Sequence, residues 1–143
     1  MLTKTNLTDK IFKLEFPYSN PYQGMQRKLL FCCSVGLLRS PTAAVIATEY
    51  GYNTRSCGSD SKALIPLSAN LIIWSDNIVF INKQNYDKAI QTFDLEDHYV
   101  NFKYEIEHRA IVWNIEDEYE YMNPELVLKV RKLLNKLPEN ISK

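Results

Sequence analysis

The chain has 143 residues, which is enough for one domain with its own hydrophobic core but short for two. Its composition is 45% hydrophobic and 24% charged with only four Gly and six Pro, which excludes a collagen-like, coiled-coil or largely disordered chain. Seventeen Lys and Arg balance seventeen Asp and Glu, so no overall positive charge attracts nucleic acid, and we expect no nucleic-acid partner.

The apolar runs are all much shorter than the roughly 20 residues of a membrane span, and the first ten residues lack the apolar stretch of a signal peptide. We therefore expect a soluble, cytoplasmic protein without membrane contact. The three cysteines form no Cys-x-x-Cys pair, and the two histidines stand at no ligand spacing from them. We expect no disulfide framework, no metal and no cofactor.

In chain order, residues 1–27 show no sustained periodicity and are assigned to an N-terminal extension, followed by one domain over residues 28–143. Residues 28–33 form a short apolar run that predicts a strand buried on both faces. A loop containing Gly36 follows. Ser40 and Pro41 then predict the N-cap and first position of a helix that ends at Gly51.

The next signals alternate between strand and helix. They predict a strand over 52–57, a short helix over 69–74, a strand over 78–81, a helix over 83–93 and a last core strand over 110–113. Between the last two, residues 100–107 alternate apolar and polar, which predicts an edge strand or a covering flap. Whether residues 94–108 form a lid is left open.

The last predicted element is a helix that starts at Asn123 and Pro124 and carries one apolar stripe. The stripe consists of Leu126, Val127, Val130, Leu133, Leu134 and Leu137. Together the elements predict a single α/β domain. We expect a four-stranded parallel sheet with helices on both faces and a phosphate-binding loop after the first strand.

The segment from Cys33 to Arg39 is the candidate site, because it joins the first strand to the first helix. A loop in that place can turn its backbone N–H groups around a tetrahedral dianion, helped by the positive end of the helix dipole. The same field stabilises a thiolate, which would make Cys33 a nucleophile at neutral pH. Arg39 adds a planar, permanently charged group that can hold two phosphoryl oxygens. These residues predict phosphoryl transfer.

With these residues, the chain from about 28 to 137 resembles the low-molecular-weight protein tyrosine phosphatases, in particular their short bacterial and phage-type members. The resemblance rests on the strand, loop and helix of residues 29–50 and on the late segment over 115–125. It implies that Cys33 attacks phosphorus to form a cysteinyl-phosphate, that Arg39 clamps the phosphate, and that Asp117 protonates the leaving group and later activates water. It also implies that the hydroxyl of Ser40 hydrogen-bonds the thiolate.

The substrate that the resemblance implies is phosphotyrosine in a protein or a small aryl phosphate, with phosphate and vanadate as inhibitors. The expected substrate-binding residues are Ser34, Val35, Gly36, Leu37, Leu38, Ser40 and Tyr119, the last lining the mouth of the site. The oligomeric state is not predicted.

This sequence departs from the family pattern at three places. Gly36 stands where the family loop commonly has Asn, and Leu38 stands where many members have a second cysteine, so their intraloop disulfide is excluded. The late loop reads Asp117, Glu118, Tyr119 and lacks the family's proline. Acidic neighbours on both sides should favour the protonated form of Asp117, which suits a general acid.

Each assignment has a structural alternative. In this alternative, Cys33 is an ordinary buried cysteine, as we expect of Cys32 and Cys57, and Arg39 is a surface residue. Ser40 is then a helix cap. In the late loop, Asp117 is then one of several solvated acids, with Glu118 as the competing acid, and Tyr119 and Tyr121 pack on the last helix.

Two other functions stay open. The first is a phosphate- or phosphoprotein-binding module with weak or no turnover. The second is an arsenate reductase on the same scaffold, which needs two more cysteines late in the chain, whereas only Cys57 follows Cys33.

Overall fold

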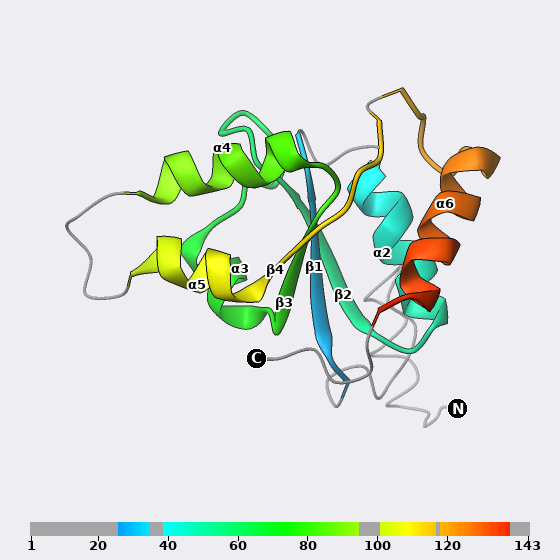
Figure 1. Cartoon of the computed structure of the whole chain (residues 1–143), viewed down its shortest axis with the longest axis horizontal. Helices are drawn as coiled ribbons and strands as arrows, with labels where there is room; N and C mark the ends of the chain where they lie inside the picture. Colours follow the sequence, from blue (N-terminus) through cyan, green and yellow to red (C-terminus); the bar gives the residue numbers. More distant parts are fainter. Residues whose placement is uncertain (1–25, 35–38, 95–100, 117, 138–143) are drawn as a thin grey trace, which may run out of the picture.

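A four-stranded, all-parallel sheet forms the centre of the computed structural model, which describes residues 26–34, 39–94, 101–116 and 118–137. The strands lie in the order β2, β1, β3, β4 (Figure 1). Their bounds are Lys28–Cys33 for β1, Asn53–Gly58 for β2, Asn77–Phe80 for β3 and Ala110–Val112 for β4. The predicted fold class and the predicted number of core strands are confirmed.

Helices cover both faces of this sheet (Figure 1). One face packs against α2 (Arg39–Glu49) and α6 (Pro124–Asn135), and the other against α3 (Ala69–Trp74), α4 (Lys83–Phe93) and α5 (Phe102–Arg109). Side chains alternate between the two cores along β1, because successive residues of a strand point to opposite faces. Phe31 and Cys33 therefore face α2 and α6, whereas Leu30 and Cys32 face the other three helices.

The helix boundaries follow from local signals in the sequence. The side chain of Asn123 accepts hydrogen bonds from the backbone N–H groups of Glu125 and Leu126, and Pro124 occupies the first turn of α6. α2 ends just before Gly51, whose φ of 96° is a left-handed conformation that glycine adopts without strain. None of the helices in the described parts of the chain is both long and apolar enough to cross a bilayer.

The predicted edge strand or flap over residues 100–107 is wrong, because residues Phe102–Arg109 form α5. Asn101 caps this helix by accepting a hydrogen bond of 2.9 Å from the N–H of Tyr104, and Glu105 forms an ion pair with Arg109 one turn later. Phe102 and Ile106, four residues apart, face the core, whereas Tyr104 between them is exposed. The alternating pattern therefore also contains two apolar residues at a spacing of four, which lie on the same face of a helix. Residues 95–100 of the segment considered as a lid lie outside the described residues.

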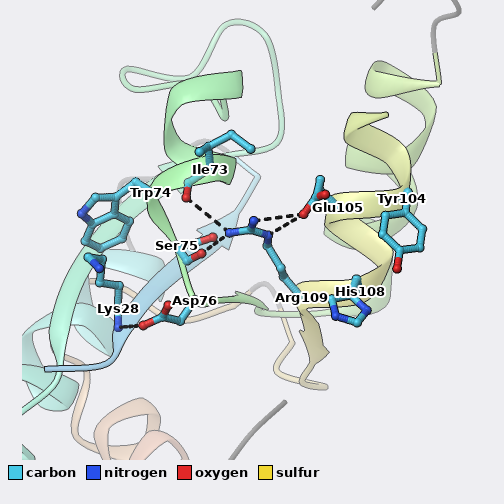
Figure 2. Close-up of a pocket in the computed structure, with 9 residues that line it drawn as sticks. All are labelled: Lys28, Ile73, Trp74, Ser75, Asp76, Tyr104, Glu105, His108 and Arg109. Atoms are coloured by element: carbon cyan, nitrogen blue, oxygen red, sulfur yellow. Dashed lines mark hydrogen bonds and ion pairs between the residues drawn. The ribbon is translucent and has the colours of Figure 1, made fainter. Parts of the chain in front are cut away.

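At the amino edge of the sheet, Arg109 joins α5 to the end of α3 (Figure 2). Its guanidinium donates hydrogen bonds to the carbonyl oxygens of Ile72, Ile73 and Ser75. Nearby, the backbone N–H of Lys28 donates to the carboxylate of Asp76. These groups surround a pocket of about 480 Å³. Because the pocket opens at the amino ends of the strands, it lies at the edge opposite Cys33, the last residue of β1.

Candidate active site

Cys33 lies at the carboxyl end of β1, and its side chain points toward α2 and α6. Its Sγ lies 3.1 Å from the Oγ of Ser40, and that hydroxyl donates a hydrogen bond of 3.2 Å to the carbonyl oxygen of Cys57. Both side chains are buried. α2 begins at Arg39, so Ser40 lies inside the first turn and is not the residue before the helix. Its hydroxyl therefore contacts the candidate nucleophile rather than serving as the predicted cap.

Arg39 is buried, with only 2% of its surface exposed, although arginine is rarely buried so deeply. Its Nη1 donates a hydrogen bond of 2.9 Å to the carbonyl oxygen of Ile115 in the segment after β4. The guanidinium therefore lies at the carboxyl edge of the sheet, where parallel α/β sheets place their ligands. This position suits a charged group that holds an anion next to Cys33.

Ser34 follows the candidate nucleophile and is bound on two sides. The Nδ2 of Asn85 in α4 donates a hydrogen bond of 3.1 Å to its Oγ, and the backbone N–H of Asp60 donates to its carbonyl oxygen at 2.9 Å. Asn82, the N-cap of α4, donates from its own Nδ2 to the carbonyl oxygen of Ile115 at 3.4 Å. Asn82 and Asn85 are not among the site residues predicted from the sequence. The available signal was a pair of asparagines three residues apart directly after a buried strand, which is typical of a capping box at the ligand-binding edge.

The late segment is joined to α6 by Lys129. Its Nζ lies 3.0 Å from the Oε1 of Glu116 and 5.0 Å from the centre of the Tyr119 ring. Hydrogen bonds to Tyr119 and to Glu116 raise the pKa of Lys129 above its usual value. A hydrogen bond from its own backbone amide, followed by that from Lys129, lowers the pKa of Glu116. One of the acidic neighbours of Asp117 is therefore an ionised carboxylate that already has a cationic partner.

Tyr119 lies in the core beside α6, with 5% of its surface exposed, and its hydroxyl donates a hydrogen bond of 3.1 Å to Glu125. This is the packing that we considered as its structural alternative. A contact between Tyr119 and a substrate stays a prediction. Glu118 and Tyr121 are exposed.

Five of the predicted site residues lie outside the described residues: Val35, Gly36, Leu37, Leu38 and Asp117. The backbone cradle and the general acid therefore stay predictions. The structure describes the residues that flank them, and it brings Cys33 to Ser40 and Arg39 to Ile115. Cys33 and Ser34 precede the predicted loop, Arg39 and Ser40 follow it, and Glu116 precedes the predicted acid.

The other two cysteines lie on the opposite face of the sheet from Cys33. Cys32 and Cys57 are register partners in neighbouring strands, and both are fully buried. A hydrogen bond with Cys57, together with burial, raises the pKa of Cys32 well above its usual value. Both are core residues, as expected. Among the described residues, no cluster of His, Cys, Asp and Glu side chains is arranged to hold a metal ion.

Solved structures with a similar fold were found, although no protein-family model and no curated protein matches the sequence. A low molecular weight protein tyrosine phosphatase from T. tengcongensis is 16% identical with a TM-score of 0.55, covering 78% of this chain and all of the other. Vibrio vulnificus Wzb in complex with benzylphosphonate is 15% identical with a TM-score of 0.55, covering 78% and 93%. The YwlE arginine phosphatase from Geobacillus stearothermophilus is 17% identical with a TM-score of 0.54, covering 76% and 85%. At the level of fold, the resemblance expected from the sequence is confirmed.

Proposed function

We propose that this chain, which has the fold of the low molecular weight protein tyrosine phosphatases, is a cysteine-dependent phosphatase that hydrolyses aryl phosphate monoesters. The observation that carries the proposal is the position of the Cys33 Sγ, 3.1 Å from the Ser40 hydroxyl and at the same edge of the sheet as the buried Arg39. A nucleophile, a hydroxyl and a permanent cation around the start of one helix suit the transfer of a phosphoryl group.

In the first step, the Cys33 thiolate attacks phosphorus while the bond from phosphorus to the leaving oxygen breaks. Asp117 gives that oxygen a proton, so that a neutral alcohol or phenol departs. Arg39 and the N–H groups at the start of α2 offset the negative charge of the phosphoryl oxygens, so the step needs no metal ion. The product is a cysteinyl-phosphate.

In the second step, a water molecule attacks this intermediate and Asp117 takes its proton. Inorganic phosphate leaves, and the thiolate of Cys33 is restored. In the structure, the Ser40 hydroxyl donates to the Cys57 carbonyl oxygen. By rotation about its C–O bond, the same hydroxyl can donate to the departing thiolate instead. Such a hydrogen bond stabilises the sulfur as a leaving group.

The preferred substrate class is phosphotyrosine in a protein. A flat ring holds its phosphate far enough from the bulk of the protein to reach a nucleophile as buried as Cys33, which is 2% exposed. The structural neighbour bound to benzylphosphonate supports an aryl group at such a site. The neighbour named as an arginine phosphatase supplies the competing substrate, phosphoarginine.

The test is hydrolysis of p-nitrophenyl phosphate, a phosphotyrosine peptide and phosphoarginine from pH 5 to 8, with and without a chelator. We expect Cys33→Ser to abolish turnover. We expect Asp117→Ala to slow the ester with the poorer leaving group most, because that group depends most on protonation. Vanadate and inorganic phosphate should inhibit, and the chelator should have no effect.

Other outcomes identify the alternatives. A protein that binds phosphate or vanadate but turns over no substrate is a binding module, and the phosphatase proposal is then wrong. Hydrolysis of phosphoarginine alone contradicts the aryl specificity but leaves the cysteine mechanism in place. Turnover that survives Cys33→Ser contradicts the mechanism itself.

A further inference from the structure

We propose that Asn85 is a positioning residue for the candidate active site, acting through the hydroxyl of Ser34. The inference rests on the proposed function, since it concerns the same phosphate site. Asn85 and Asn82 together form what we call the asparagine bridge, which connects the start of α4 to the residues on both sides of the predicted phosphate loop.

The first part of the bridge is a complete capping box. The Oδ1 of Asn82 accepts a hydrogen bond from the backbone N–H of Asn85, and the Oδ1 of Asn85 accepts one from the backbone N–H of Asn82, both at 3.2 Å. These two hydrogen bonds give partners to backbone N–H groups at the start of α4, and they use only the oxygen atoms of the two side chains. Capping therefore does not account for their two Nδ2 groups.

Both of these Nδ2 groups donate toward the candidate site. That of Asn85 donates to the Oγ of Ser34 at 3.1 Å, and that of Asn82 donates to the carbonyl oxygen of Ile115 at 3.4 Å. The same carbonyl oxygen accepts from Arg39. One short segment of α4 is thereby connected to Ser34, at one end of the predicted loop, and through the Ile115 carbonyl to Arg39 at the other end.

Because Asn85 is buried, its hydrogen bond holds Ser34 in a fixed position. Asn85 is 1% exposed, so its amide cannot exchange a lost partner for bulk water. Because Ser34 directly follows Cys33 in the chain, the hydrogen bond from Asn85 restrains the residue next to the candidate nucleophile. Catalysis of phosphoryl transfer depends mainly on such fixed positions of charge and nucleophile.

The test is a double-mutant cycle with two readouts, the affinity for orthovanadate and the kcat/KM for p-nitrophenyl phosphate. The variants are Ser34→Ala, Asn85→Ala and the double variant, with Ser34→Thr as the variant that keeps the hydroxyl. Asn101→Ala is the matched control, since Asn101 also caps a helix but lies at the start of α5. Thermal unfolding of every variant reports the effect on stability.

We expect each alanine variant to lose about tenfold in both readouts, the effect of leaving one buried polar group without its partner. The double variant should lose about the same, because both single changes break one shared contact. Ser34→Thr should keep most of the wild-type affinity, and Asn101→Ala should lower stability while leaving vanadate affinity unchanged.

Losses that multiply in the double variant, or a Ser34→Ala variant with wild-type affinity, would overturn the proposal. The vanadate measurement separates it from the proposed function. A wild-type protein that binds vanadate without turnover, but shows the non-additive pattern, contradicts the phosphatase and supports the positioning role. A protein that hydrolyses its substrate but shows additive losses supports the phosphatase and contradicts the positioning role. A wild-type protein that does not bind vanadate contradicts both proposals.

Discussion

The Nη1 of Arg39 donates a hydrogen bond of 2.9 Å to the carbonyl oxygen of Ile115, a residue 76 positions later in the chain. Arg39 is the first residue of α2, and Ile115 lies two residues before Asp117. The residue that we propose as the phosphate clamp is therefore in direct contact with the segment that leads to the proposed general acid. Two segments that are far apart in sequence and that the proposed mechanism uses share one contact at the carboxyl edge of the sheet.

Replacing this arginine by lysine should remove most of the activity although the charge is kept. A lysine has no planar fork, so it loses the paired hydrogen bonds to the phosphoryl oxygens together with the bond to Ile115. We expect Arg39→Lys to lower kcat/KM for p-nitrophenyl phosphate about a hundredfold, measured by steady-state kinetics. The control is Arg131→Lys at the exposed ion pair with Glu49, which should keep wild-type activity. An Arg39→Lys variant with near-normal kcat/KM would contradict the clamp.

Ser40→Ala should slow the second chemical step more than the first. The variant loses the hydroxyl 3.1 Å from the Cys33 Sγ, which we propose stabilises the departing thiolate. We expect kcat to fall about tenfold, the effect of one hydrogen bond to a charged group, with a burst of p-nitrophenol in stopped-flow traces as cysteinyl-phosphate accumulates. Ser75→Ala removes another buried hydroxyl, bonded to the Ile72 carbonyl oxygen, and should show neither effect. A lower kcat without a burst of p-nitrophenol would contradict the proposed role of Ser40 in the second step.

Lys129→Met should lower thermal stability more at neutral pH than in acid. The Glu116 carboxylate has its pKa lowered from 4.5, so its contribution is present above that value and is lost as pH falls through the lowered pKa. Lys129 has its pKa raised from 10.5, so its contribution persists up to at least that pH. Because the pair is exposed, the difference in Tm should be at most a few degrees. Calorimetry from pH 3 to 8 measures it, with Lys132→Met as the control. A Tm difference that is constant across this range would contradict the ion pair.

The three cysteines should differ in reactivity in the folded protein. Cys32 and Cys57 are fully buried, and the raised pKa of Cys32 keeps its thiol protonated at neutral pH. Iodoacetate should therefore label Cys33 alone, and inorganic phosphate should slow the reaction by occupying the same site. Peptide mass spectrometry identifies the labelled residue, and unfolding in guanidinium should expose all three. Labelling of Cys32 in the folded protein would contradict its placement in the core.

Local patterns predicted most of the secondary structure because each helix and strand has its own signal. The apolar run that forms β1, the proline at the start of α6 and the stripe that α6 buries are all properties of neighbouring residues. α5 shows the limit of this approach. Its apolar residues alternate as in a strand, but the cap at Asn101 and the ion pair of Glu105 with Arg109 favour the helix.

Sequence patterns alone predicted the fold class and the order along the chain of the residues that we propose for the chemistry, Cys33, Arg39 and Asp117. Which residues surround Cys33 and Arg39 follows only from the way the strands and helices pack together. The strand order β2, β1, β3, β4 places the start of α4 beside the end of β1, and so brings Asn85 to Ser34 across 51 positions of sequence. Contacts of this kind depend on how strands pair over long distances, which no local pattern encodes.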